Sequence, residues 1–426
     1  MKKYYLSKLS PEEYAQILKR PSINISGAIE SVKPILEDVK LTGLPAVIKY
    51  AKKFDDFEGE ILVSQEEIKN AEKDVDPKVK AALKRVYKNI EKYHLPQKPV
   101  SYRVETEEGV ECYREFRAIE NVGLYIPGGT APLPSTVLML GIPAKIAGCK
   151  RIVATSPSSN KKINPEILYS ANLCGITEFY KIGGAQAIAL LAYGDTSIKK
   201  TDKIFGPGNQ YVTAAKMLAS IDPEGCAIDM PAGPSEVLVL ADKYANLEFI
   251  VADLLSQAEH GTDSQSILVT ENDKFAVMID EEIERQLKVL KRKTIIRKSL
   301  RNTYVLIVDD IAEAIKFSND YAPEHLILNI KNAPDYISKI ENAGSVFLGA
   351  YSPESAGDYA SGTNHSLPTY GYAKSNGGVS VESFMKSISF QQLSSKGLHS
   401  LAETVIELAE AESLDAHANA VKVRQK

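Results

Sequence analysis

The sequence has few cysteines and no pair of them at close spacing. Its 426 residues contain four, Cys112, Cys149, Cys174 and Cys226, and none lies in a CxxC motif. This spacing argues against a disulfide framework and against a thiolate metal site. We therefore expect the cysteines to be small buried apolar side chains.

The sequence also lacks an excess of basic charge and any long apolar run. With a net charge of −4 and a pI near 6.0, it offers no basic field for nucleic acid or an anionic membrane. Its apolar runs are far too short to span a bilayer, and residues 1–14 are too polar for a secretory signal. We expect a cytoplasmic protein without nucleic-acid or membrane partners.

The first hundred residues are mostly helical in pattern. A capping box with proline at residues 10–13 predicts a helix start, and residues 27–42 and 44–54 predict a helical pair broken at a glycine. A second capping box begins at Ser64, and helical periodicity then continues to His94.

From about residue 121 the pattern changes to short apolar runs, each followed by a helical stretch. The runs start near residues 122, 151, 178, 202, 236, 266, 304, 325 and 345. Strands that alternate with helices predict parallel sheets. Turns up to residue 209 are rich in glycine and later ones in carboxylates and histidine, so we place a boundary near Ser235. The predicted fold class is α/β, with two Rossmann-like domains and small helical N- and C-terminal segments. From about Val379 the pattern is helical again, and no internal repeat is visible.

The stretch from Ala343 to Gly371 concentrates glycine, serine, asparagine, aspartate and histidine after a short apolar run. Residues 345–348 predict a strand, and the glycines and prolines that follow predict a long irregular loop. Loops after strands are where α/β proteins place their chemistry. Asp358 and His365 could reach one metal or substrate, although a solvated surface loop is the alternative.

A second candidate lies in residues 253–265. If the helix that starts near Asn246 continues, Asp253, Gln257 and His260 fall at i, i+4 and i+7 on one polar stripe. Gln257 and His260 could then present an oxygen and a nitrogen to one cation. The alternative is a histidine that only contacts the helix C-terminus.

A third candidate is the pair Glu324 and His325, directly before a predicted strand. Pro323 fixes the approach of the chain, and adjacent residues at a strand entrance point in different directions. One side chain could act as a general base for water and the other for an alcohol. An ordinary turn with a solvated Glu–His pair is the alternative.

Three glycine-rich turns, at residues 125–136, 181–187 and 204–212, each lead from a strand into a helix. Backbone N–H groups in such turns can approach a phosphate or another anion. None reads GxGxxG, so tight connections remain the alternative. The chain has six histidines, and those at positions 260, 325 and 365 all lie in polar turns of the second α/β region, which favours one metal or acid–base site.

Seven segments, in order along nearly the whole chain, together resemble the histidinol dehydrogenase family. They are LYIPGGTAPLPSTVLMLGIPA, KIGGAQAIA, KIFGPGN, AIDMPAGPSEVLVLAD, DLLSQAEHGTDSQ, PEHLI and AGSVFLGAYSPESAGDYASGTNHSLPTYG. The resemblance implies oxidation of L-histidinol through L-histidinaldehyde to L-histidine, the last two steps of histidine biosynthesis. It also implies consumption of two NAD and one Zn²⁺ per subunit.

The resemblance further implies roles for particular residues. The implied acid–base pair is His325 for the alcohol proton and Glu324 for the water that hydrates the aldehyde. Implied metal ligands are Gln257, His260, Asp358 and His417. Implied substrate contacts are Ser235, Gln257, His260, His325, Asp358, His365, Glu412 and His417. Implied NAD contacts are Tyr125, Gln186 and Asn209. Two imidazoles and two oxygens suit zinc, although manganese or cobalt would also be accepted.

The family is a homodimer, which implies that Glu412 and His417 of one subunit complete the site of the other. The implied domains are a helical segment at 1–24, a catalytic and metal-binding domain at 25–124 with 236–379, an NAD-binding domain at 125–235 and a tail at 380–426. Other hypotheses are a dehydrogenase for another alcohol, a metal-dependent hydrolase and a zinc-binding module without catalysis.

Overall fold

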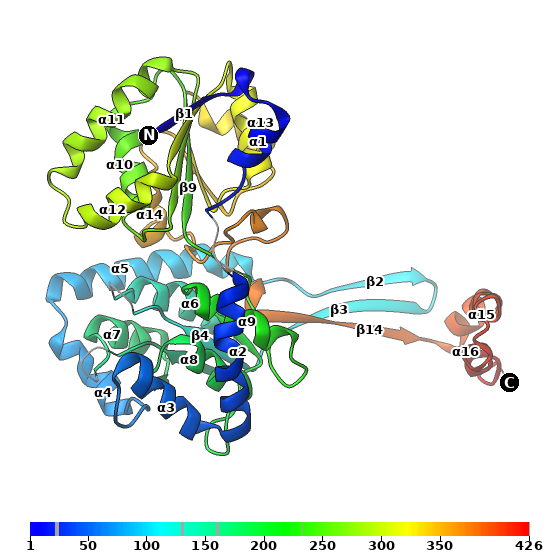
Figure 1. Ribbon diagram of the computed structural model, residues 1–426. Coiled ribbons are helices and arrows are strands. Elements are labelled where there is room, and N and C mark those ends of the chain that lie inside the picture. Colours follow the sequence, from blue (N-terminus) through cyan, green and yellow to red (C-terminus); the bar gives the residue numbers. More distant parts are fainter. Residues whose placement is uncertain (22–24, 129–131, 159–161, 232, 426) are drawn as a thin grey trace.

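The computed structural model describes residues 1–21, 25–128, 132–158, 162–231 and 233–425. Two α/β halves lie one above the other, and a long arm extends sideways from the lower half (Figure 1). Part of the predicted glycine-rich turn at 125–136 falls outside the described residues.

The lower half is built on a five-stranded parallel sheet. Its strands are β4 (Asn121–Tyr125), β5 (Arg151–Thr155), β6 (Glu178–Tyr180), β7 (Lys203–Phe205) and β8 (Ala227–Ile228), in the order β6-β5-β4-β7-β8. All five residues of β4 are buried, as expected of a central parallel strand covered on both faces.

Helices cover both faces of this sheet. One layer consists of α2 (Ile25–Thr42), α3 (Leu44–Asp55), α8 (Gly184–Tyr193) and α9 (Gln210–Ile221). The other consists of α4 (Gln65–Asn70), α5 (Pro77–His94), α6 (Pro134–Ala147) and α7 (Pro165–Cys174). Many of these helices begin at a side-chain cap. Asn209, for example, accepts hydrogen bonds from the N–H groups of Tyr211 and Val212.

The upper half is built on a six-stranded parallel sheet. Its strands are β1 (Lys2–Tyr5), β9 (Glu236–Ala241), β10 (Gln265–Thr270), β11 (Tyr304–Ile307), β12 (His325–Asn329) and β13 (Ser345–Leu348), in the order β1-β11-β10-β9-β12-β13. One face packs against α10 (Leu247–Ala258), α11 (Asp273–Leu287) and α12 (Lys293–Ser299). The other packs against α1 (Pro11–Ile17) and α13 (Ile311–Tyr321). A short helix, α14 (Glu354–Tyr359), follows β13.

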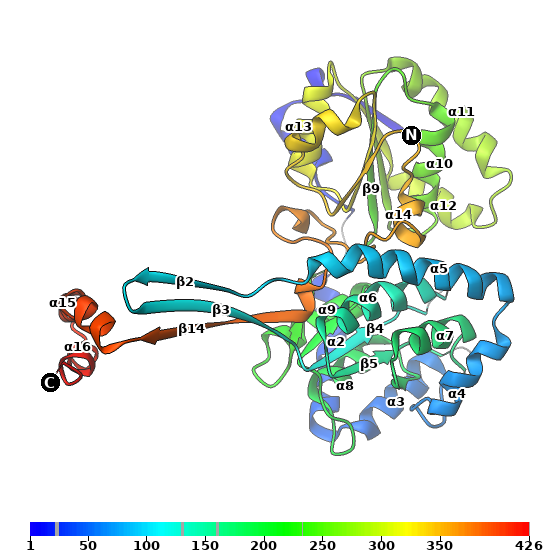
Figure 2. The ribbon, with the colours of Figure 1, turned by 180° about the vertical axis from the view of Figure 1, so that it is seen from behind.

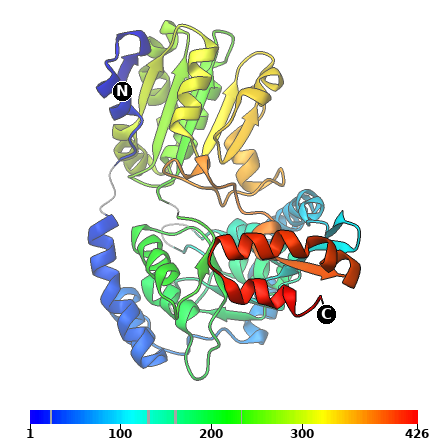
Figure 3. The ribbon, with the colours of Figure 1, turned by 90° about the vertical axis from the view of Figure 1, so that its right-hand side faces the viewer.

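The arm is an antiparallel sheet that carries two helices at its end. Strand β3 (Val110–Ala118) pairs with both β2 (Tyr102–Glu107) and β14 (Met385–Leu393). Helices α15 (Ser395–Ala411) and α16 (Asp415–Lys422) lie at the tip of the arm, far from both α/β halves (Figure 2). A view along the arm shows this helical pair in front of the rest of the molecule (Figure 3).

The nine strands predicted from apolar runs are all present, and the predicted fold class is confirmed. The N-terminal helical pair is confirmed as α2 and α3. The segment from Ser64 to His94 is two helices, α4 and α5, rather than one. Strands β1, β2, β3, β8 and β14 were not predicted, and β14 replaces the first part of the predicted C-terminal helical region.

The structure also places residues 25–97 differently from the predicted domain assignment. Helices α2 to α5 were grouped with residues 236–379, but their apolar faces pack into the two cores that cover the five-stranded sheet. An amphipathic helix shows from its sequence that one face is buried, but not which sheet buries it. Among the described residues, no helix is both long enough and apolar enough to cross a membrane.

Candidate active site

A cavity of about 320 Å³ lies between the two sheets. Pro127, Gly208 and Asn209 line it and come from turns that follow β4 and β7, at the carboxyl edge of the five-stranded sheet. Residues that precede or begin β9, β10 and β12, at the amino edge of the six-stranded sheet, line it from the other side. They include Ser235, Ser264, Glu324 and His325. Two opposite sheet edges therefore form one site.

Glu324 and His325 stand where β12 begins, as the sequence predicts for the acid–base pair. Both side chains are buried, and both are held by the backbone of one residue on the neighbouring strand. The N–H of Glu236 donates to Oε2 of Glu324 at 2.8 Å, and its carbonyl oxygen lies 3.2 Å from Nδ1 of His325. A carbonyl can only accept, so Nδ1 of His325 carries the proton of that bond. Nε2 has no hydrogen-bond partner within the described chain.

The environment shifts the pKa of both groups. Burial raises the pKa of Glu324, which brings the carboxyl closer to the range of a general base at neutral pH. Burial also opposes the charged form of His325, but Glu354, Glu324 and Asp358 outweigh it and raise the pKa of the imidazole well above its ordinary value. Oδ1 of Asp358 lies 3.5 Å from Nε2 of His325.

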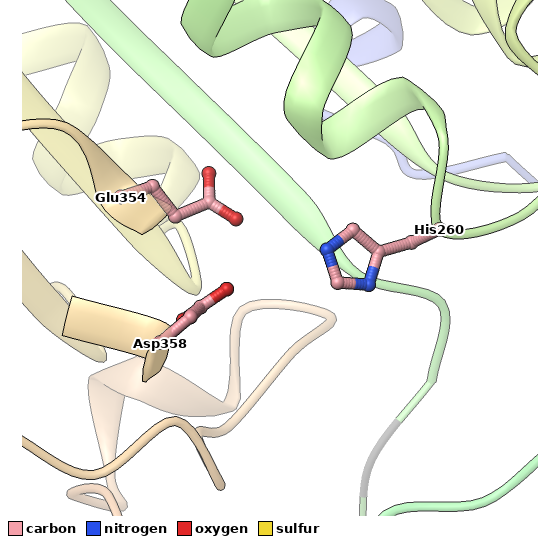
Figure 4. Close-up of side chains that lie close together, drawn as sticks. All are labelled: His260, Glu354 and Asp358. Carbon is pink, nitrogen blue, oxygen red and sulfur yellow. The ribbon is translucent and has the colours of Figure 1, made fainter. Parts of the chain in front are cut away.

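A candidate metal centre adjoins the pair. Ligand atoms of His260, Glu354 and Asp358 all lie within 4.8 Å of one another. Figure 4 shows the two carboxylates of α14 pointing toward the imidazole across a gap. Gln257, one turn earlier on α10, is fully buried, and neither its amide oxygen nor its nitrogen has a partner among the described residues. An orphaned buried amide three residues before the imidazole of His260 fits a cation that prefers nitrogen and oxygen ligands.

Glu354 is a member of this cluster that the sequence reasoning missed. It is 1% exposed, burial raises its pKa, and Oε2 has no partner within the described chain. The signal was available, because Glu354 lies in the same polar stretch as Asp358. The prediction of a long irregular loop hid the fact that the two side chains share one turn of a helix.

His365, a predicted substrate contact, lines the cavity. Its Nδ1 lies 3.0 Å from the carbonyl oxygen of Asp358, and its Nε2 lies 3.1 Å from Oγ1 of Thr136 on α6. Burial lowers the pKa of His365, so the ring is neutral near pH 7. Thr136, which the sequence did not single out, connects the two halves of the molecule at this point.

A second cavity, of about 830 Å³, contains all three predicted NAD contacts, Tyr125, Gln186 and Asn209. The hydroxyl of Tyr125 accepts a hydrogen bond from the N–H of Gly184 at 3.1 Å, and burial raises the pKa of Tyr125 to about 12. Nε2 of Gln186 donates to Oδ2 of Asp55 at 3.2 Å, and burial raises the pKa of this carboxyl. Pro127, Gly208 and Asn209 line both cavities, so the two cavities are adjacent.

Two predicted site residues are not brought to this site by the single chain. Glu412 follows α15 and His417 lies on α16, and both are exposed at the tip of the arm. The other predicted contacts converge on the two cavities or, for Gln257, on the α10 turn beside them. Two buried carboxylates of α14 face the exposed imidazole of His260 and lie beside the buried His325. Such a cluster next to a large cavity at the carboxyl ends of parallel strands defines a two-domain α/β enzyme.

The comparisons with known proteins identify the family of this enzyme. The family model described as histidinol dehydrogenase matches residues 18–425. The chain is 51% identical to histidinol dehydrogenase of Bacteroides thetaiotaomicron over 417 residues, 97% of each chain. It is 51% identical to the enzyme of Vibrio parahaemolyticus over 421 residues, 98% of this chain and 96% of the other. A crystal structure of histidinol dehydrogenase from Elizabethkingia anophelis superposes with a TM-score of 0.94 at 50% identity, covering 100% of this chain and 98% of that one. The chain belongs to the histidinol dehydrogenase family and is an oxidoreductase.

Proposed function

We propose that this enzyme oxidises L-histidinol to L-histidine through L-histidinaldehyde, in the last two steps of histidine biosynthesis, with two NAD and one Zn²⁺ per subunit. The observation that supports this most is the position of the Glu324–His325 pair. It lines the smaller cavity together with His260 and Asp358, and Asn209 lines both that cavity and the larger one. We propose a cytoplasmic location, in keeping with four free cysteines.

His325 is proposed to accept the alcohol proton at Nε2, because Nδ1 is engaged with the carbonyl oxygen of Glu236. Glu324 is proposed to activate the water that adds to the aldehyde. One of its oxygens is held by the N–H of Glu236, which leaves the other for the water. A positioned acid or base contributes about 10²–10⁴ in rate.

NAD, when bound, would supply the hydride acceptor that both oxidation steps need. The larger cavity supports a dinucleotide because it lies at the carboxyl ends of β4 to β7, and the chain returns there through glycine-rich turns. Gln186 and Asn209 present amides to this space, and Tyr125 presents a neutral hydroxyl. The hydrolase hypothesis leaves this cavity without a role.

The proposed ligands of zinc are Gln257, His260 and Asp358, with His417 supplied by a second copy of the chain. Bound zinc would act as a Lewis acid that polarises and orients polar groups of the substrate. Metal binding at Asp358 would also withdraw one carboxylate from His325, so the pKa of the imidazole would fall toward the range a general base needs.

We propose a homodimer in which the arm of each subunit reaches the other subunit's site. The arm and its helices expose apolar side chains that a monomer leaves in water, among them Val104, Phe390 and Leu408. An arm that extends away from its own halves could carry Glu412 and His417 to a second copy.

The first test counts the NADH formed from L-histidinol by the purified protein. About two NADH per histidinol consumed, lost with a chelator and restored by zinc, is the expected result. No NADH from the zinc-loaded protein would contradict histidinol as the substrate, and other amino alcohols would then be screened.

The shared site has a separate test. Mixing inactive His417→Ala protein with inactive His260→Ala protein, after exchange of subunits, should restore part of the activity, because one of the two sites of each heterodimer is intact. Absence of any recovery in verified heterodimers would show that each subunit completes its own site.

A further inference from the structure

Glu236 has an unusual position in the candidate site. Its backbone contacts both proposed catalytic side chains. The N–H donates to Glu324, and the carbonyl oxygen accepts from His325. The orientation of both groups, and the ring nitrogen that His325 presents to the cavity, therefore depend on where the first residue of β9 lies. A contact that holds Glu236 in place therefore also orients the side chains of Glu324 and His325.

The side chain of Glu236 is a carboxylate buried to 1% exposure. A buried carboxylate is tolerated only when it is paired and hydrogen-bonded. Nε of Arg20 donates to Oε2 of Glu236 at 2.8 Å, and the N–H of Tyr370 donates to Oε1. The side chain of Arg20 is itself only 10% exposed, so water screens this ion pair weakly.

Arg20 also contacts the turn that leads into the catalytic pair. Its Nη2 donates to the carbonyl oxygen of Ala322 at 3.0 Å, and its guanidinium lies 3.6 Å above the centre of the Tyr321 ring. Ala322 has φ of +54°, a conformation that costs a non-glycine residue free energy and persists only where neighbours hold it. One guanidinium therefore bridges the start of β9 and the residues just before Glu324.

We propose that Arg20 is a positioning residue for the Glu324–His325 pair, acting through the side chain of Glu236 and the carbonyl of Ala322. Arg20 lies outside both cavities and does not line the space for substrate or cofactor. The N-terminal helical segment, which contains Arg20, thus sets the geometry of the reaction. This proposal deepens the proposed function and rests on the roles assigned there to Glu324 and His325.

The main test replaces Arg20 with methionine, which keeps much of the volume and removes every donor. We expect kcat for histidinol oxidation to fall about 10- to 100-fold, because Glu236 loses its buried cation and the carbonyl of Ala322 loses its donor. The KM values for histidinol and NAD should stay within about threefold. Arg20→Lys should recover part of the loss, because an ammonium can reach one of the two acceptors but cannot bridge both.

Tyr304→Phe is the matched control. The hydroxyl of Tyr304 donates to the carbonyl oxygen of Ile17 at 2.7 Å, so this variant also loses a buried hydrogen bond to the N-terminal segment, but none to Glu236. Both variants should lose thermal stability, whereas only Arg20→Met should lose kcat. Equal kcat losses in the two variants, or wild-type kcat in folded Arg20→Met, would overturn the proposal.

A readout without turnover separates this inference from the proposed function. In protein labelled with ¹⁵N-histidine, the ring signals of His325 can be assigned by their absence in His325→Gln. Arg20→Met should change the ring-nitrogen shifts of His325, and Tyr304→Phe should leave them unchanged. Unchanged shifts in Arg20→Met would contradict the inference even if histidinol proved not to be the substrate.

Discussion

The two sheets have the same topology but turn opposite edges toward the site. Apart from β1, the order β11-β10-β9-β12-β13 repeats the order β6-β5-β4-β7-β8, with all strands parallel in both. The five-stranded sheet presents its carboxyl edge to the cavities, and the six-stranded sheet presents its amino edge. The same strand order therefore builds both walls of the site, from a carboxyl edge in one sheet and an amino edge in the other.

The two edges differ most in charge. Among the described residues that line the larger cavity, Asp55 is the one charged side chain. The amino edge of the six-stranded sheet, with α14 beside it, gathers Glu324, His325, Glu354 and Asp358, all buried. Glycine turns and helix N-termini suit the binding of a dinucleotide, whereas buried titratable groups suit proton transfer. The chemistry at the edge of a sheet therefore does not follow from its strand order.

The largest expected effect comes from the charged edge. His325→Gln should lower kcat for histidinol by about 10²–10⁴, because the alcohol proton loses its acceptor. Glu324→Gln should act mainly on the second step, so that histidinaldehyde accumulates or is released while the first hydride transfer continues. Single-turnover NADH formation from histidinol and from histidinaldehyde would measure the two steps separately. Unchanged turnover in Glu324→Gln would refute its assigned role.

The buried titratable groups around the six-stranded sheet should also lower the free energy of unfolding. Burial raises the pKa of Asp253, on α10, to about 7. Because the folded-state pKa lies above the unfolded value, the folded protein loses stability as pH rises from about 4 to about 7. Asp253→Asn should therefore be about as stable as the wild type near pH 4 and more stable above pH 7. At 1.36 kcal/mol per pKa unit, the gain has an upper limit of about 4 kcal/mol.

Denaturant unfolding of the two proteins at several pH values would measure this difference. Asp273→Asn, at the exposed start of α11, is a suitable control that should show no such trend. A stability difference between Asp253→Asn and wild type that does not change with pH would show that the carboxyl is not forced into its neutral form.

The sequence predicts most of the fold because central parallel strands are continuous apolar runs and the turns between them carry glycine or proline. It does not predict the arm. All of β2 is exposed, so no buried face marks it, and β3 and β14 pair across a long separation in sequence. The repeated strand order is also invisible, because topology can persist without residue identity.

The site residues divide in the same way. Residues with diagnostic side chains in polar turns, such as His260, His325 and Asp358, could be singled out from the sequence as candidates. The contribution of Glu236 is made by its backbone N–H and carbonyl, which every non-proline residue has, so no sequence pattern marks it. The placement of Glu412 and His417 stays a prediction, because it depends on a second copy of the chain.

A smaller effect is expected from a change at the carboxyl edge of the five-stranded sheet, where NAD is proposed to bind. Gln186→Met keeps the size of a side chain that is 1% exposed but removes its amide. The variant would lose the neutral hydrogen bond proposed between this amide and NAD. Such a bond is worth about 0.5–1.5 kcal/mol, so KM for NAD should rise roughly 2- to 10-fold. KM for histidinol should not change. Isothermal titration of NAD into the wild type and into Gln186→Met would check the kinetic value. An equal rise in the KM values for NAD and histidinol would contradict a binding site for NAD that is separate from the site for histidinol.

The smallest effect is expected at the carboxyl edge of the six-stranded sheet. A depression of about 480 Å³ lies there between the turns after β9 and β12, where the strand order reverses and doubly wound folds usually bind ligands. Its lining includes Lys243 and Lys331, both exposed, and the two oxygens of Asp242 already accept N–H groups of Tyr244 and Lys331.

We expect the double variant Lys243→Ala and Lys331→Ala to keep kcat and both KM values within about twofold, because exposed lysines in solvent contribute little to a site at the opposite edge. Steady-state kinetics at two ionic strengths would check this. A larger change would mean that the carboxyl edge of the six-stranded sheet also takes part in binding or catalysis. The two sheets would then differ in the ligand that each carboxyl edge binds, and not in which edge they use.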